Sequence, residues 1–204
     1  MELNNGHCGV ETVWNVVRTA PKLSLSPELE QAIDRCRSYL ETKLNAETGA
    51  AIYGVNTGFG DLASTRVEAK ELSELQRNLL VSHSCGVGDE VPAEIVRAMV
   101  LLKIKSLGRG YSGVRLETVQ RLVDHWNAGL FPSVPSQGSL GASGDLAPLS
   151  HMVLPLIGEG EVWVEGTPVP ARDVLAAKGW KPLDLGAKEG LALINGTQLM
   201  LGYG

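Results

Sequence analysis

The stretch GSLGASGDLAPL, residues 138–149, decides how the rest of this sequence is interpreted. Its glycines at positions 138, 141 and 144 predict an irregular loop, which we place from about Phe131 onward. On the ordinary interpretation, Asp145 caps this loop and a helix begins near Pro148. A phosphate-binding loop is a weaker alternative, because the glycine spacing matches neither the Walker nor the Rossmann pattern.

Residues 142–146 give the stretch a more specific meaning. They read Ala-Ser-Gly-Asp followed by an apolar residue. That is the signature of the aromatic amino acid lyases, and the chain resembles the N-terminal portion of the histidine ammonia-lyases in that family. The resemblance implies that the Gly144 nitrogen attacks the Ala142 carbonyl, and that water is lost from the ring and from the Ser143 side chain. The product is a 4-methylidene-imidazol-5-one, a cofactor that the chain makes from itself, so no external cofactor is expected.

The three residue types suit this chemistry. Glycine lets a backbone nitrogen approach the carbonyl two residues earlier, because it has no side chain in the way. Ser143 supplies a β-hydroxyl that can be eliminated, and Ala142 adds little bulk. The electrophile is needed because general acid–base catalysis contributes only about 10²–10⁴-fold, too little to expel ammonia unaided. Covalent bonding to the substrate supplies the rest, and a helix N-terminus at Asp145 would sharpen the electrophile.

The loop YGVNTGFG, residues 53–60, is the second match to the family. Its glycines predict irregular structure. The resemblance implies that Tyr53 removes the β-proton of the substrate. The ordinary alternative is a buried tyrosine whose hydroxyl is hydrogen-bonded, but the eight-residue match favours the catalytic role.

His83 is the residue on which we base the choice of substrate. It falls on an apolar helical stripe with Leu75 and Leu79, where a histidine is most often a hydrogen-bonded core residue. In the family, however, the corresponding position faces the substrate side chain, and the phenylalanine enzymes carry an aliphatic residue there. An imidazole at this position would hydrogen-bond a substrate imidazole, whereas leucine would favour a phenyl ring.

The segment LINGTQ, residues 193–198, is the last match, and the family's asparagine beside the electrophile falls on Asn195. The run Ser150-His151-Met152 also resembles the histidine branch. The other candidates lack partners for a nucleophile or a metal site. We assign no role to His7, Cys8, Cys85, His125 and His151.

Four helices are predicted by apolar residues that recur every three or four positions. The first begins at Ser26-Pro27-Glu28, with a capping serine and a proline in the first turn. The second carries His83, and the third begins after Pro92. The fourth ends at Gly129, which is suited to a left-handed cap.

Composition narrows the class of protein. The 204 residues are 44% hydrophobic and 20% charged, which is typical of a globular chain with a real core. A formal net charge of −5 gives no electrostatic reason to expect nucleic acid or an anionic membrane as partner. Three scattered cysteines and the lack of a signal peptide predict a cytoplasmic protein with free thiols. Charged residues, glycine or proline interrupt every apolar stretch before it reaches membrane-spanning length.

The end of the chain indicates how the parts are organised. Residues 161–169 alternate as a short β-hairpin that turns at Glu165-Gly166, and residues 188–204 are predicted to be helical. The resemblance implies a mainly α fold in which residues 1–187 form the irregular N-terminal domain that bears the electrophile. Residues 188–204 would then begin the first helix of a central bundle that is mostly missing.

The family resemblance implies the deamination of L-histidine to urocanate and ammonia by a homotetramer. We expect this chain to be an inactive fragment of such an enzyme, because the groups that bind the substrate's carboxylate and amine would lie beyond residue 204. Two alternatives stay open: a tyrosine or phenylalanine lyase or aminomutase of the same chemistry, and a silent module that serves only assembly.

Overall fold

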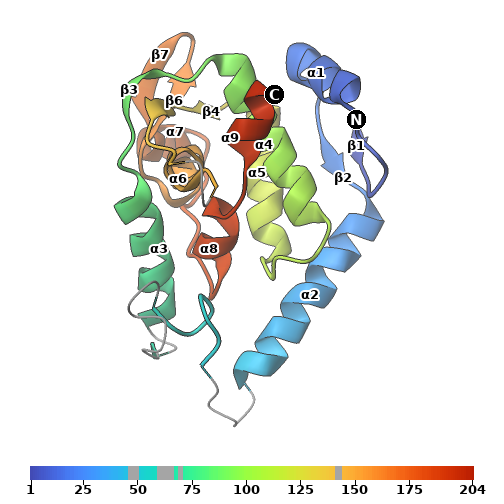
Figure 1. Ribbon diagram of the computed structural model, residues 1–204, viewed down its shortest axis with the longest axis vertical. Helices are drawn as coiled ribbons and strands as arrows, with labels where there is room; N and C mark the ends of the chain where they lie inside the picture. The colour runs from blue at the N-terminus through green and yellow to red at the C-terminus, as the bar shows by residue number, and fades with distance from the viewer. Residues whose placement is uncertain (46–50, 59–66, 69–70, 141–143) are drawn as a thin grey trace.

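The computed structural model describes residues 1–45, 51–58, 67–68, 71–140 and 144–204. Over these residues the architecture is mainly α-helical with three small sheets, as predicted (Figure 1). The helices are α1 (Val10–Thr19), α2 (Pro27–Asn45), α3 (Leu72–His83), α4 (Ala93–Gly108), α5 (Leu116–Ala128), α6 (Leu146–Val153), the 3₁₀ helix η3 (Leu154–Ile157), α7 (Ala171–Ala177), α8 (Glu189–Ile194) and α9 (Gln198–Tyr203). None of the described helices is long and apolar enough to cross a membrane.

The strands are short and serve to tie loops together. They are β1 (Glu2–Leu3), β2 (Ser24–Leu25), β3 (Val87–Glu90), β4 (Phe131–Pro132), β5 (Pro135–Gln137), β6 (Glu161–Val164) and β7 (Thr167–Pro170). The first two pair in parallel, β3 pairs with β5 in antiparallel fashion, and β4, β6 and β7 form an antiparallel sheet in that order.

Helix α4 runs through the centre of the molecule and packs against α1, α5 and α9 (Figure 1). Its buried face includes Met99, Ile104 and Leu107, which are at most 1% exposed. Removing these side chains from water is the main force that holds the helices together. Lys103 lies on the same helix and is also 1% exposed, so a charged residue type sits inside this core.

Three boundaries that local sequence signals predicted, one helix start, one helix end and one hairpin turn, are found in the structure. The Ser26 hydroxyl accepts a hydrogen bond from the Leu29 nitrogen (3.4 Å) at the start of α2. Helix α5 ends at Gly129 with φ +70°, the predicted left-handed cap. The β6–β7 hairpin turns at Glu165 and Gly166, both with positive φ (50° and 81°), as a two-residue primed turn requires. These three predictions are confirmed.

The stretch after Phe131 is more regular than predicted. It contains β4 and β5, and each pairs with a strand distant in sequence. Helix α6 begins at Leu146, and Pro148 lies in its first turn, close to the predicted start.

Residues 188–204 do not form the single helix that was predicted. They form α8 and α9, separated by Asn195-Gly196-Thr197, where Asn195 adopts an extended conformation (φ −81°, ψ 116°). The break is stabilised by partners outside the two helices: Lys103 binds carbonyls at the end of α8, and Asp145 binds a backbone N–H at the start of α9. We call residues 195–197 the α8–α9 junction.

Candidate active site

Gly144 is the one member of the predicted electrophile triplet within the described residues; Ala142 and Ser143, with Gly141, lie outside them. Gly144 has φ +96°, and a Cβ atom built on it would lie 2.5 Å from the Gly196 carbonyl oxygen. The next residue donates from its backbone to that same oxygen (Asp145 N to Gly196 O, 2.9 Å). Only glycine fits at position 144, because any side chain would meet both backbone strain and a fixed carbonyl.

The Asp145 carboxylate holds the loop from both sides. It is 3% exposed. Its Oδ1 accepts a hydrogen bond from the Ser139 hydroxyl (3.2 Å), and its Oδ2 accepts one from the Met200 backbone nitrogen (3.0 Å). Asp145 occupies the N-cap position of α6, as the ordinary interpretation expected, but its side chain makes no capping bond to that helix and binds the first turn of α9 instead.

Asn195 meets the loop at the α8–α9 junction. It is exposed, and it directly precedes Gly196, whose carbonyl contacts Gly144 and Asp145. Its own carbonyl accepts a hydrogen bond from the Lys103 ammonium group (3.1 Å). The structure thus brings together the segments of Asn195 and Gly144, two positions predicted for one site.

His83 is the last residue of α3 and is half-buried, not enclosed in the core. Its Nδ1 lies 2.8 Å from the Leu79 carbonyl oxygen and 3.2 Å from the Ser82 hydroxyl. A carbonyl can only accept, so Nδ1 carries the hydrogen, and in the neutral ring Nε2 is the acceptor. His83 can therefore offer an acceptor at Nε2 to a donor.

The end of α3 is held at the start of the predicted electrophile loop. The Gly86 nitrogen donates to His151 Nε2 (3.0 Å), and a Cβ on Gly138 would lie 3.0 Å from the Gly86 Cα. Burial lowers the pKa of His151, against the opposing charge of Glu90, which favours the neutral acceptor that this bond needs. The sequence analysis assigned His151 no role, and this long-range contact has no local signal.

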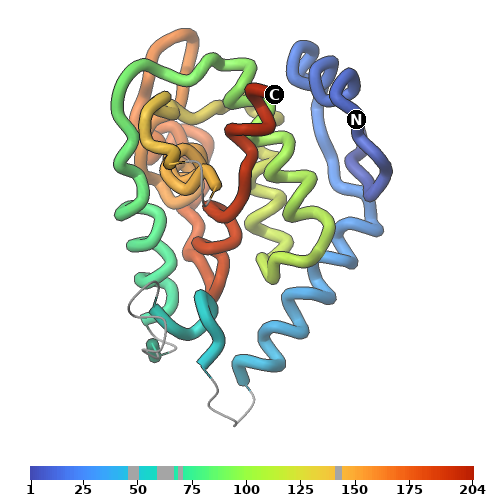
Figure 2. The backbone as a smooth tube through the Cα atoms, viewed as in Figure 1, coloured from blue at the N-terminus to red at the C-terminus, as the bar shows by residue number. Residues whose placement is uncertain are grey.

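Tyr53 lies on a different loop, the cyan segment at the lower end of the view in Figure 2. Its side chain is 57% exposed, so it is not the buried aromatic of the ordinary alternative. The loop is held by its own polar groups: the Ile52 nitrogen donates to Asn56 Oδ1 (2.7 Å) and the Gly54 nitrogen to the Thr57 hydroxyl (3.2 Å). Within the described residues, the hydrogen bonds given above for Gly86, Asp145 and Asn195 are made with segments other than this loop.

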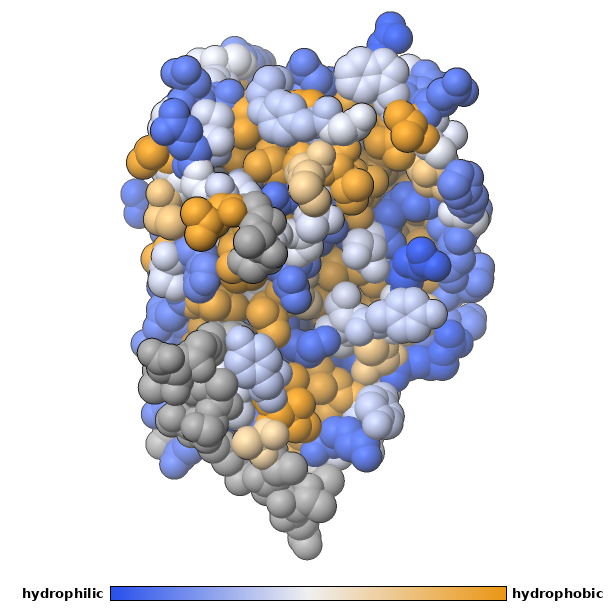
Figure 3. Space-filling view, in the orientation of Figure 1, coloured by the Kyte–Doolittle hydropathy of each residue, from blue (hydrophilic) through white to orange (hydrophobic). Residues whose placement is uncertain are grey.

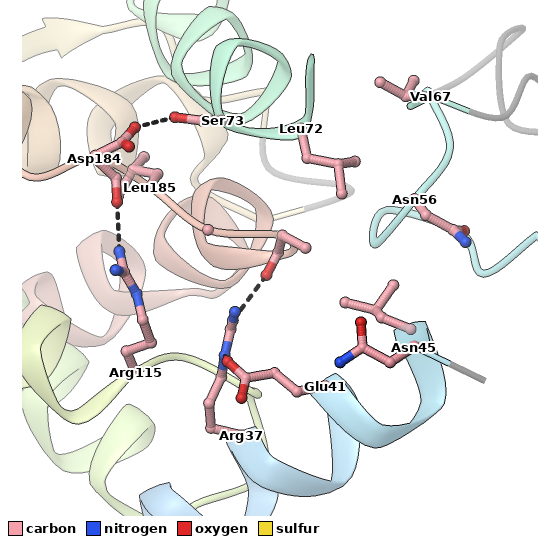
Figure 4. Close-up of a pocket in the computed structure, with 13 residues that line it drawn as sticks. Arg37, Glu41, Asn45, Asn56, Val67, Leu72, Ser73, Arg115, Asp184 and Leu185 are labelled. Atoms are coloured by element: carbon pink, nitrogen blue, oxygen red, sulfur yellow. Dashed lines mark hydrogen bonds and ion pairs between the residues drawn. The ribbon is translucent and has the colours of Figure 1, made fainter. Parts of the chain in front are cut away.

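A cavity of about 450 Å³ lies beside Asn56 and is shown in Figure 4. Its cationic groups are already paired. Arg37 binds Glu41 (2.7 Å) and the Ala187 carbonyl, and Arg115 binds the fully buried Glu189 (2.7 Å). Arg37 and Arg115 thus stabilise the fold, and we do not place the active site in this cavity.

Lys103 is the residue at the site that the sequence analysis missed. Besides the Asn195 carbonyl, its Nζ reaches the Ala192 carbonyl at 3.5 Å. Burial lowers the pKa of Lys103 to about 7, and the charge of Asp145 opposes this shift. A signal was present, since Lys103 stands four residues after Met99 on the apolar face of its helix, where a lysine is unusual.

Comparisons with known proteins agree with this arrangement. The family described as aromatic amino acid lyase matches residues 8–204. A histidine ammonia-lyase from Deinococcus radiodurans is 50% identical over 191 residues, which cover 94% of this chain and 36% of that protein. One from Symbiobacterium thermophilum is 48% identical, covering 97% of this chain and 39% of that protein.

Solved structures give the same result for the fold. A tyrosine aminomutase from Streptomyces globisporus is 40% identical with a TM-score of 0.91, over 99% of this chain and 38% of that one. A histidine ammonia-lyase from Trypanosoma cruzi is 36% identical with a TM-score of 0.88, over 98% of this chain and 38% of that one. The chain spans less than two fifths of the length of these relatives.

Proposed function

Because the chain belongs to the aromatic amino acid lyase family, we propose that it is the electrophile-forming part of a histidine ammonia-lyase, which converts L-histidine to urocanate and ammonia. The observation that carries this proposal is the fit of Gly144 against Gly196, where no side chain can be accommodated. Relatives that are 48–50% identical bear the name histidine ammonia-lyase, which supports the substrate. We further propose that the active enzyme is a homotetramer in the cytoplasm.

The described residues fit a cyclised backbone at Ala142-Ser143-Gly144. Attack by the Gly144 nitrogen on the Ala142 carbonyl needs a bare Cα and a backbone held in an uncommon conformation. Gly196 and Asp145 supply that constraint from outside the triplet. The methylidene-imidazolone, once formed, would supply an electron-poor carbon–carbon double bond that bonds to the substrate and activates it for loss of ammonia.

The other predicted residues then have distinct tasks. Tyr53 takes the β-proton, and the electrons of that C–H bond become the new double bond as ammonia departs. His83 accepts a hydrogen bond at Nε2 from the N–H of the substrate imidazole, which its Nδ1 bond to Leu79 supports. Asn195 contributes its amide beside the electrophile, and its position next to Gly196 supports this.

A tyrosine-specific aminomutase or lyase is the second candidate. It is favoured by the solved tyrosine aminomutase structures, at 39–40% identity and TM-scores of 0.90–0.91. The imidazole of His83 can also bind a phenol hydroxyl, whereas a phenyl ring offers it no partner. Phenylalanine is therefore the least suitable substrate.

Intact mass of the purified chain tests the electrophile directly. We expect a chain two water molecules lighter than its sequence, and we expect that Ser143→Ala does not lose two waters, because it lacks the hydroxyl to be eliminated. A full-mass wild-type chain would contradict the proposal. The substrate is then decided by measuring turnover of L-histidine, L-tyrosine and L-phenylalanine in a full-length lyase that carries this segment.

A further inference from the structure

We propose that Lys103 is a positioning residue for backbone cyclisation: its buried ammonium group holds the α8–α9 junction against Gly144. The inference rests on the proposed function and deepens it. It assigns a task to a buried cationic group outside the Ala-Ser-Gly triplet and outside Tyr53, His83 and Asn195.

The first step is the contact between α4 and α8. The Lys103 Nζ donates to the carbonyl of Asn195 at the C-cap of α8 (3.1 Å) and to that of Ala192 in its last turn (3.5 Å). Carbonyls at a helix C-terminus lack partners within the helix and carry a partial negative charge. An ammonium group satisfies both needs, so it fixes the point at which α8 stops.

The second step leads from the junction to the loop. The residue after Asn195 is Gly196, and its carbonyl receives the Asp145 backbone N–H (2.9 Å) and excludes any side chain from Gly144. A displacement of the Asn195 carbonyl would therefore move the group against which Gly144 is placed. The Asp145 carboxylate also accepts a hydrogen bond from the Met200 nitrogen (3.0 Å), so the loop is connected to α9 on the other side of the same junction.

The third step explains why the residue is a lysine. Its surroundings on α4 are apolar, with Met99, Val100 and Ile104 all at most 3% exposed. A methionine of similar length would pack there without the cost of burying an amine. Packing thus gives no reason for a charge, whereas the carbonyls of the junction and the nearby charge of Asp145 do.

The test compares Lys103→Met with Lys103→Arg, which keeps a cation, and with Lys105→Met, a matched change on the same helix. Lys105 binds the Asn4 carbonyl (3.3 Å), away from the junction. Each chain is made by cell-free synthesis, so that it starts uncyclised, and intact mass gives the fraction that has lost two waters at successive times after synthesis. A urea titration gives the stability of each chain.

We expect Lys103→Met, which leaves two carbonyls without a donor, to be less stable than the wild type but still folded without urea, and to cyclise at least tenfold more slowly. Lys103→Arg should restore most of the rate, and Lys105→Met should match the wild type. With a merely structural role, Lys103→Met would cyclise more slowly only because less of the chain is folded, and the rate of the folded fraction would equal that of the wild type. Wild-type cyclisation in a folded Lys103→Met chain, or no recovery in a folded Lys103→Arg chain, would overturn the inference. A wild-type chain that never loses water would instead overturn the proposed function itself.

Discussion

At the level of single residues, a comparison of Gly144 with Gly129 distinguishes the cost of backbone strain from the cost of a steric clash. Gly144 has φ +96° with the Gly196 carbonyl in the space of a Cβ, whereas Gly129 has φ +70° with nothing within 4 Å of a Cβ. Any L-residue at either position adopts an unfavourable conformation, at a cost of about 1–3 kcal/mol. Only at Gly144 does the new side chain also meet fixed backbone.

Gly144→Ala is therefore expected to abolish the loss of two waters, while Gly129→Ala loses stability but cyclises normally. Intact mass and a urea titration of both variants measure the two effects separately. Normal cyclisation in Gly144→Ala would show that the contact with Gly196 does not constrain the triplet.

His83 is the residue where substrate choice can be tested. In a full-length lyase, His83→Leu should reduce kcat/KM for L-histidine by about 10- to 100-fold, because an imidazole N–H would face an apolar wall without an acceptor. Turnover of L-phenylalanine should appear or rise. Kinetics with both substrates give the answer, and an unchanged preference for histidine would return His83 to a structural role.

Burial of His125 leads us to expect that the free energy of unfolding decreases in acid. It is 5% exposed and packs against Trp180, and burial, with smaller effects of the charges on Arg121 and Lys178, lowers its pKa from 6.5 to about 4. Between pH 6.5 and pH 4 the unfolded chain binds a proton at His125 more readily than the folded chain does. The contribution of neutral His125 to the free energy of unfolding is therefore complete above pH 6.5 and declines as pH falls toward 4. The decline amounts to about 3 kcal/mol.

His125→Phe should remove this part of the acid sensitivity while keeping a ring beside Trp180. Urea titrations at about pH 7 and at about pH 4, the folded-state pKa, should show a smaller difference for the variant than for the wild type. His7→Phe, a change at an exposed histidine, serves as control. Equal acid sensitivity in wild type and His125→Phe would assign the effect to other groups.

At the level of elements, the sequence predicts what depends on neighbours in the chain. Ser26, Gly129 and the Glu165-Gly166 turn set their boundaries through local backbone chemistry, so the limits of α2, α5 and the hairpin could be anticipated. The break between α8 and α9 could not, because Lys103 and Asp145, which stabilise it, lie 92 and 55 residues away from their partners.

The same reason accounts for the errors around Asp145 and Phe131. A local capping rule predicts that the Asp145 carboxylate accepts a hydrogen bond from its own helix. In the structure it accepts hydrogen bonds from the Met200 N–H of α9 and the Ser139 hydroxyl instead. Strands β4 and β5 have two and three residues, too few for a periodic pattern, and exist through pairing with β6 and β3. In the candidate site, the family motif predicted which residues take part, whereas the groups that hold them in place, such as Lys103 and Asp145, were found only in the structure.

At the scale of the whole molecule, apolar surface stays uncovered at the end of the chain. Met200, Leu201 and Tyr203 on α9 are each 58% exposed, and Figure 3 shows hydrophobic side chains on this face of the molecule. By contrast, Leu193 and Leu199 are at most 7% exposed, because α8 and α9 pack against α6 and α4. The exposed apolar surface of α9 is therefore available to a second copy of the chain.

The isolated 204-residue chain should cyclise yet show no measurable turnover of L-histidine. It spans 36–39% of the length of its histidine ammonia-lyase relatives, and correct positioning of reactants is worth about 7–11 kcal/mol. The electrophile alone provides activation but not that positioning. The measurements are urocanate absorbance with L-histidine and the mass of the chain in solution, with Leu201→Lys as a variant that should reduce any self-association through α9. Turnover by a stable monomer at the rate of a full-length lyase would show that these residues contain a complete site. Tyr53, His83 and Asn195 would then act without the remainder of the family's fold.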